Sequence, residues 1–235
     1  MLLFSLIIGI GICYGLPVAG VIFLMRKEKG TGKAFFWGAL AFVVSQLLIR
    51  IPILQLLLPK FAWFSVLPLY PWAYGLFLGV TAGLAEESAR WIAMKLFLRE
   101  RRSFEHGLAF GLGHGGIEAM LLVGPNMIAG AVMTLAGQAT LFPADWGSVL
   151  IAGAERIFAF AFHVGASLLI LYGAREGKAL WFWILAVVLH TVLDAAVVIL
   201  PQIFGVGVLG IELYAALCGS LTLCLGIWVY HRKSI

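Results

Sequence analysis

The chain has 235 residues, of which 63% are hydrophobic and only 11% are charged, and its mean hydropathy is +1.05. A soluble globular protein is nearer half apolar and a quarter charged, so this composition excludes a soluble enzyme and predicts one integral membrane domain over residues 1–235. The formal net charge is +5, but the basic residues lie between apolar runs. They are interpreted as topology signals, and no nucleic-acid partner is expected.

Charged or turn-rich breaks divide the sequence into seven apolar runs, each near or above the ~20 residues that span a bilayer. In chain order the runs are 2–25, 34–58, 72–98, 106–136, 150–172, 179–200 and 207–230. The fourth run is long and contains Gly124-Pro125, which predicts either a kinked helix or a helix followed by an interfacial segment. The expected fold is all-α, a polytopic bundle of about seven transmembrane helices.

Lysine and arginine alternate between successive connections. The basic connections are 26–33, 99–105, 173–178 and the C-terminal tail. The connections almost free of Lys and Arg are 59–71, 141–148 and 201–207. Because cytoplasmic connections carry the excess of basic residues, the alternation predicts an N-terminus outside and a C-terminus in the cytoplasm. We expect a multi-pass protein of a cell membrane, the cytoplasmic membrane of a prokaryote.

The third run contains charged residues in the stretch TAGLAEESARWIAMK (81–95). An acidic or basic side chain at the centre of a membrane helix costs about 2.5–3.5 kcal/mol, whereas a Leu or Phe returns only about 0.3–0.6 kcal/mol. Charged residues placed this deep indicate function. Glu86 and Glu87 point about 100° apart, and Arg90 is close enough in the helix to pair with either one. One glutamate can therefore be neutralised while the other is left for chemistry.

Three further runs carry polar residues at a similar depth, within the core at about 72–200. These residues are His114, Glu118, His163, His190 and Asp194. At about 1.5 Å per residue from the basic end of each run, they lie roughly 12–23 Å deep, as the acidic pair does. Residues four apart share a helix face, so His114 lies beside Glu118 and His190 beside Asp194. Such a pair can fix a histidine tautomer or chelate one metal ion.

Structural interpretations remain open for individual residues. A lone His163 is typical of a hydrogen bond to a neighbouring helix, and HGGIE or HTVLD alone is as typical of an interhelical hydrogen bond as of chemistry. Arg50 and the Glu155-Arg156 pair lie near the outer ends of their runs, where long side chains snorkel. Glu155 is a secondary site candidate, because it precedes His163 by eight residues. The convergence of four helices favours a functional site over a purely structural network.

Three motifs, in their order along the chain, resemble those of a known group of intramembrane proteases. EESAR (86–90), FGLGH (110–114) and HTVLD (190–194) are similar to the Glu-Glu…Arg, Phe-x-x-x-His and His-x-x-x-Asn/Asp motifs of the CAAX-prenyl protease and bacteriocin-immunity (Abi) superfamily. The additional HGGIE and HVGAS, with the chain length, most resemble its YhfC branch, with PrsW-type proteases as relatives. The resemblance covers about residues 80–195. One difference is that Glu86 precedes Arg90 by four residues, where the CAAX proteases have five.

The resemblance implies an intramembrane endopeptidase in which a glutamate activates the water that cleaves a membrane-associated or transmembrane peptide. The cavity would be reached from the membrane or the cytosol. The implied catalytic residues are Glu86, Glu87, Arg90, His114, His190 and Asp194. The resemblance implies that one of Glu86 and Glu87 is the general base and that His114 helps to hold the water or a metal ion. It implies that His190 with Asp194 orients or stabilises the oxyanion.

The residue types also match the ligands of a catalytic zinc-like ion, which takes three protein ligands and a water. The candidate ligands for zinc or another divalent ion are His114, Glu118, His163 and His190. Without a metal ion, a buried glutamate can act as the base while a histidine holds the water. A transporter or ion pathway with a polar site at mid-membrane is the alternative function, and paired histidines on facing helices could hold a haem.

Overall fold

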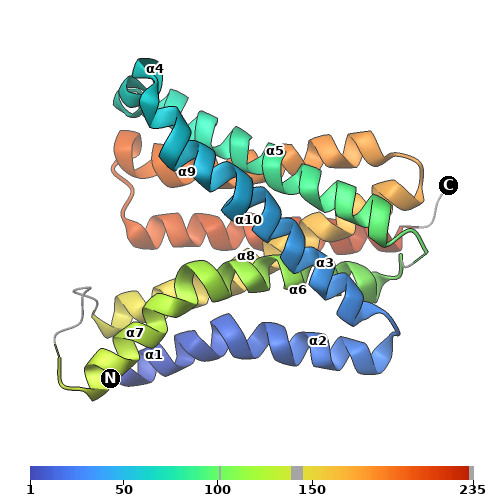
Figure 1. Ribbon diagram of the computed structural model, residues 1–235, viewed down its shortest axis with the longest axis horizontal. Coiled ribbons are helices and arrows are strands. Elements are labelled where there is room, and N and C mark those ends of the chain that lie inside the picture. The colour runs from blue at the N-terminus through green and yellow to red at the C-terminus, as the bar shows by residue number, and fades with distance from the viewer. Residues whose placement is uncertain (101, 139–144, 233–235) are drawn as a thin grey trace.

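The computed structural model describes residues 1–100, 102–138 and 145–232 (Figure 1). Every regular element in these ranges is helical and no described residue lies in a strand, which confirms the predicted all-α class. Parts of the predicted connections 99–105 and 141–148 and of the basic tail lie outside the described residues. The N-terminus and the end of α10 (Val208–His231) lie at opposite ends of the bundle, as an odd number of crossings requires (Figure 1).

Six helical spans are long and apolar enough to cross a membrane. They are Leu2–Lys27, Thr31–Lys60, Phe104–Leu135, Trp146–Arg175, Ala179–Phe204 and Val208–His231. A seventh crossing is α5 (Pro71–Phe97), which passes the same test only together with the short helix before it, bent away by 116°. The six to seven candidate spans agree with the predicted runs to within a few residues at most ends, because length and apolar composition are what the bilayer selects.

Several spans contain more than one helical segment. The α-helical segments not yet named are α1 (Leu2–Ile10), α2 (Leu16–Lys27), α3 (Thr31–Phe42), α4 (Ala62–Val66), α6 (Phe104–Glu118), α7 (Gly124–Leu135), α8 (Trp146–Arg175) and α9 (Ala179–Phe204). The π-helical segments are η1 (Gly11–Gly15), η2 (Val43–Arg50), η3 (Ile53–Leu57) and η6 (Ala119–Val123), and short 3-10 turns form η4 (Leu58–Lys60) and η5 (Leu67–Leu69).

The segment η6 explains how the fourth span passes Pro125 without ending. The Gly124 N–H donates to the Ala119 carbonyl, which is the five-residue spacing of a π-helix. The next carbonyl, that of Met120, would face Pro125, which has no N–H to donate. Tyr14 Oη donates to the Met120 oxygen instead, at 2.8 Å. The fourth span therefore continues through Gly124-Pro125 with a local change of helix type. It is not a helix followed by a separate interfacial segment.

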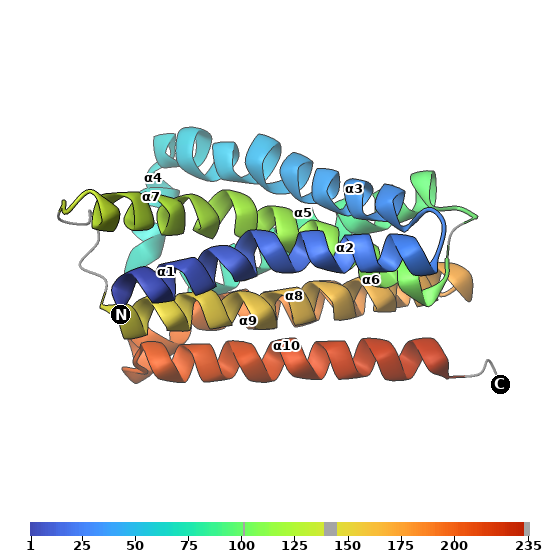
Figure 2. The same cartoon turned by 90° about the horizontal axis from the view of Figure 1, so that it is seen from below.

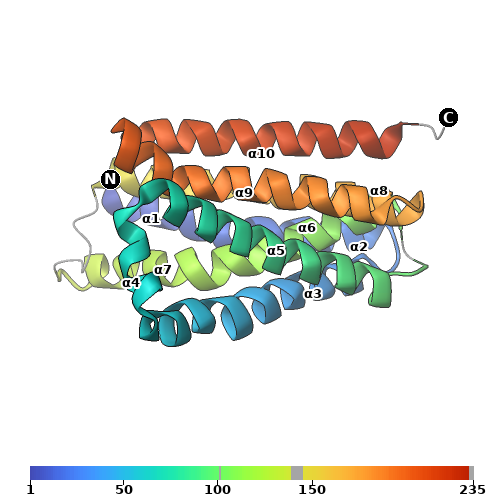
Figure 3. The same ribbon diagram turned by 90° about the horizontal axis from the view of Figure 1, so that it is seen from above.

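Close backbone contacts bring the polar helices together. A Cβ at Gly79 of α5 would lie 2.6 Å from the Thr191 carbonyl oxygen of α9, and one at Gly113 of α6 would lie 2.0 Å from the Phe35 oxygen of α3. Only glycine permits these approaches. Figure 3 shows α9, α5 and α3 side by side, and their contacts agree with that order.

The helix α8 occupies the middle of the bundle. Of its most apolar window 72% is buried inside the protein, against 28% or less for the other five spans. It contacts α6 on one side and α10 on another, and Figure 2 shows α10 along one edge of the bundle. His163 of α8, which is 4% exposed, is therefore enclosed by neighbouring helices.

Candidate active site

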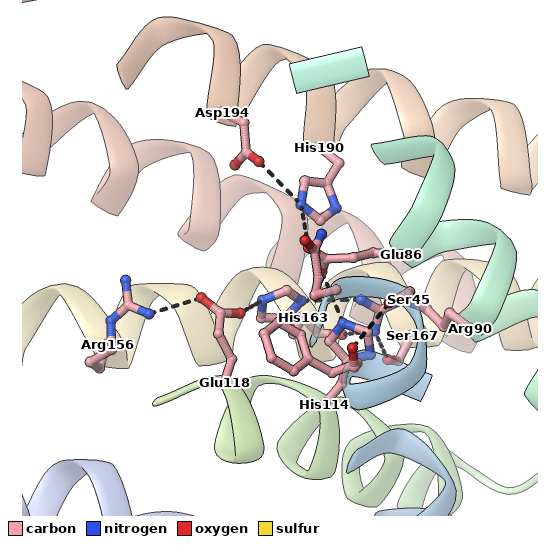
Figure 4. A network of polar contacts seen from close by, with 12 residues as sticks. Ser45, Glu86, Arg90, His114, Glu118, Arg156, His163, Ser167, His190 and Asp194 are labelled. Carbon is pink, nitrogen blue, oxygen red and sulfur yellow. Dashed lines mark hydrogen bonds and ion pairs between the residues drawn. The ribbon is translucent and has the colours of Figure 1, made fainter. Parts of the chain in front are cut away.

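The polar residues predicted from the sequence come together in the middle of the bundle (Figure 4). They come from α5 (Glu86, Glu87, Arg90), α6 (His114, Glu118), α8 (His163) and α9 (His190, Asp194). Two residues that the sequence analysis did not select join them: Gln46 from η2 and Ser167 from α8. Their signal was polarity, since Gln46 lies near the centre of the second apolar run and Ser167 one helical turn after His163.

Glu87 is fully enclosed by partners. Arg90 Nε donates to its Oε2 at 2.8 Å and Arg90 Nη2 to its Oε1 at 3.3 Å. His190 Nδ1 lies 2.8 Å from the same Oε1. Both Glu87 and Arg90 are 0% exposed. A buried carboxylate needs this degree of pairing and hydrogen bonding, and Glu87 has no contact with the cavity described below.

Arg90 also determines which ring nitrogen of a neutral His163 carries the proton. Its Nη1 donates to the His163 carbonyl oxygen at 3.0 Å and to Ser167 Oγ at 2.5 Å, and its Nη2 lies 3.1 Å from His163 Nδ1. A guanidinium can only donate, so Nδ1 accepts and the proton of a neutral His163 is on Nε2. That nitrogen lies 2.7 Å from Glu118 Oε2, which accepts the hydrogen bond.

Glu86 has different surroundings from Glu87. Its Oε2 lies 2.9 Å from His114 Nε2, and Gln46 Nε2 donates to its Oε1 at 2.5 Å. The expected pairing of His114 with Glu118 inside α6 is replaced by two bonds between helices, His114 to Glu86 and Glu118 to His163. Glu86 is only 5% exposed, yet it forms part of a cavity wall.

The cavity has a volume of about 350 Å³ and lies between the spans. Its polar lining consists of Glu86, Glu118, Glu155, Arg156, His163, His190, Asp194 and Glu212. His190 is held at Nδ1 by Glu87, and its Nε2 lies 3.7 Å from both Glu86 Oε1 and Asp194 Oδ2. His190 and Asp194, which were predicted to share a helix face, both line this cavity, and the Asp194 side chain is 36% exposed.

Two arginines that were expected to snorkel have polar partners inside the bundle. Arg156 Nη1 donates to Glu118 Oε1 at 2.9 Å, and its guanidinium also pairs with Glu155. Arg50 donates to Gln46 Oε1, Thr81 Oγ1 and the Leu78 carbonyl oxygen. Partners on neighbouring helices were available to both side chains, and a charge in the bilayer is more stable beside such partners than against lipid.

The site contains a compact set of metal-ligand atoms. Glu86, His114 and His163 each offer one such atom, all within 4.8 Å of one another, and all three residues are buried. Two imidazoles and a carboxylate form a ligand set of catalytic zinc, so the residue types present fit a divalent ion. Binding through His163 Nε2 would replace its hydrogen bond to Glu118. Of the predicted ligands, His114 and His163 belong to this group, Glu118 bonds to His163, and His190 lies beside Glu86.

Comparison with known proteins identifies the family. A family model described as YhfC intramembrane metalloprotease matches residues 12–218, the range that holds every residue of the site. The chain belongs to the YhfC family. It is 27% identical over 248 residues to the uncharacterized membrane protein YhfC of Bacillus subtilis (strain 168), covering 95% of this chain and 93% of that one. No solved structure matches it. The predicted resemblance to the YhfC branch is thus confirmed.

Proposed function

We propose that the protein is an intramembrane endopeptidase that hydrolyses a peptide bond with water in the cavity beside Glu86. The observation that carries the proposal is the buried group of Glu86, His114 and His163, two members of which line that cavity. A pocket with convergent polar groups is the expected place for chemistry, and ionisable residues inside a membrane are functional by default. The description of the YhfC family as an intramembrane metalloprotease supports this reaction class.

The metal ion that the family name implies would be held by Glu86, His114 and His163. We expect zinc, because it is commonly held in catalytic sites by this number and type of ligands. When bound, such an ion polarises the scissile carbonyl and lowers the pKa of its water to about 7. Glu86 then serves as a ligand, and a different carboxylate must accept the proton of the water.

We assign the proton transfer to Glu118. Its carboxylate lines the cavity with Oε2 2.7 Å from His163 Nε2, while Arg156 holds its other oxygen at 2.9 Å. A general base needs this position, within hydrogen-bond reach of the reacting water. Arg156 keeps the carboxylate from turning away from the cavity.

His190 is assigned to the substrate carbonyl. Its Nδ1–H is anchored by Glu87, so its Nε2 is directed at the cavity, where the doubly protonated imidazolium form can donate to the developing oxyanion. Arg90 and Glu87 position His163 and His190 and do not line the cavity themselves. The acidic pair thereby divides into a ligand and a positioning residue.

The proposed substrate is a membrane-associated or transmembrane peptide, because the cavity lies between spans at the depth of the bilayer interior. The proposal includes a single membrane domain over residues 1–235, a relation to the CAAX-prenyl protease, Abi and PrsW superfamily, and a place in the cytoplasmic membrane of a prokaryote.

A transporter or ion pathway is the second candidate. The carboxylates of Glu155, Asp194 and Glu212 along the cavity favour it, since such residues mark ion pathways in membranes.

The deciding experiment compares the wild type with Glu86→Gln and Glu100→Gln in proteoliposomes. Glu100 is exposed in the turn that follows α5 and serves as the matched control. Extracted membrane peptides are added, and new termini are identified by mass spectrometry. We expect cleavage by the wild type and the control and none by Glu86→Gln, with one ion per active chain by elemental analysis. Ion flux without new termini would reject the protease in favour of the pathway. Activity without a stoichiometric ion would make Glu86 the base rather than a ligand.

A further inference from the structure

Gln46 is a buried polar residue in direct contact with the functional glutamate. It is 4% exposed in the middle of the second span. Its Nε2 donates to Glu86 Oε1 at 2.5 Å, and its Oε1 accepts from Arg50 Nη1 at 3.1 Å. A guanidinium only donates and a carboxylate only accepts, so these two neighbours permit one orientation of the amide. The Gln46 N–H groups therefore face Glu86.

Arg50 is itself anchored to the helix that carries Glu86. Its Nη2 donates to the Leu78 carbonyl oxygen at 2.8 Å and its Nε to Thr81 Oγ1 at 3.2 Å. The hydrogen bonds thus form a closed path that leaves α5 at Leu78 and Thr81, passes through Arg50 and Gln46, and returns to α5 at Glu86. A closed set of bonds of this kind resists rotation of the Glu86 carboxylate, because turning it would break the bond to Gln46 and leave a buried donor unpaired.

The backbone around Gln46 is also unusual. Gln46 and Arg50 both lie in η2, a π-helical segment of eight residues. Most π-helical segments are single turns, and they occur frequently at functional sites. The Gln46 carbonyl accepts from the Ile51 N–H, the wider spacing of this helix type. This wider turn is an observation independent of the hydrogen bonds, and it coincides with the residue that contacts Glu86.

We propose that Gln46, held by Arg50, is a positioning residue that fixes the plane of the Glu86 carboxylate. With Oε1 occupied by Gln46, Oε2 is the oxygen directed at His114 and the ligand group. Hydrogen bonds to a metal-binding carboxylate tune the site, and their loss costs roughly 10–100-fold in metal affinity or activity. The inference rests on the proposed function, since it gives Gln46 a role in the same site.

The test uses Gln46→Met, which removes the amide while keeping a side chain of similar length, and Gln55→Met as a control. Gln55 lies on the same span and is exposed. The full-length protein is purified in detergent and titrated with Co²⁺, and the affinity and visible absorption spectrum are recorded. We expect a roughly 10–100-fold loss of affinity with an altered spectrum for Gln46→Met, and no change for Gln55→Met. Equal affinities and spectra in the two variants would reduce Gln46 to a structural contact and overturn the proposal.

A second variant covers the case in which Gln46→Met does not fold, as judged by its thermal unfolding without metal. Arg50→Lys keeps the charge but cannot hold Gln46, Thr81 and the Leu78 carbonyl together. We expect a smaller loss of Co²⁺ affinity in the same direction, and an unchanged affinity and spectrum here would also overturn the proposal. Failure of the wild type to bind Co²⁺ is a separate result. It rejects the metal centre itself, and the role of Gln46 with it.

Discussion

His190 Nδ1 lies 2.8 Å from Glu87 Oε1, and this bond joins α9 to α5 one helical turn beyond the closely packed Gly83. The adjacent Glu86 points to the cavity instead. Two neighbouring residues of the same type therefore have different environments. One is enclosed by Arg90 and His190, and the other is open to the place where a substrate would bind.

Glutamine substitutions should separate the two glutamates. Glu87→Gln leaves the fully buried Arg90 without its counter-charge, so we expect a loss of stability of about 3–5 kcal/mol. Glu86→Gln should unfold near the wild-type temperature but lose the bound ion. Thermal unfolding in detergent and elemental analysis measure the two effects. The opposite pattern, an unstable Glu86→Gln and a metal-free but stable Glu87→Gln, would reverse our assignment.

Metal affinity should increase with pH. The group of Glu86, His114 and His163 offers a carboxylate and two imidazoles, and such ligands bind an ion only in their unprotonated forms. Protons therefore compete with the ion, and binding should weaken as the pH falls. Titration with Zn²⁺ in weak buffer should also release protons. An affinity independent of pH, without proton release, would exclude imidazole and carboxylate ligands from the site.

Asp194 should matter less than its position in HTVLD suggests. Glu87 holds His190 at 2.8 Å, whereas Asp194 Oδ2 is 3.7 Å from the other ring nitrogen. We expect Asp194→Asn to keep the cleavage rate within roughly tenfold. His190→Gln, which removes the donor to the oxyanion, should lose roughly 10²–10³-fold. A larger loss for Asp194→Asn than for His190→Gln, at equal folding, would show that Asp194 contacts the substrate.

The orientation predicted from the basic connections can be tested directly. A fluorescent protein fused after residue 235 should fluoresce, because the C-terminus is expected in the cytoplasm. Alkaline phosphatase inserted in the connection 59–71 should be active, because that side is expected to be outside. Removal of the basic residues from 26–33 serves as a comparison and should weaken the preference. Active phosphatase at the C-terminus would invert the topology.

The sequence alone determined the membrane class and the approximate spans, and it predicted a shared level for the polar residues. These features depend on local quantities, since a bilayer selects runs of apolar residues by length and each residue adds a fixed rise along a helix. For this reason the sequence predicts His114, His163 and His190 beside the acidic pair. The motif order, together with HGGIE, HVGAS and the chain length, was sufficient to indicate the YhfC family.

Only the tertiary structure decided which partner each polar side chain has. Glu86 and Glu87 differ by about 100° around one helix, so their roles depend on which neighbouring helix lies at each angle. Gln46 of the second span donates a hydrogen bond to Glu86 of the third. Gln46 lies in a π-helical segment that no apolar periodicity predicts. Arg50 turns inward because acceptors on α5 are within reach. Contacts between residues distant in sequence set these outcomes, and a pattern read along the chain does not contain them.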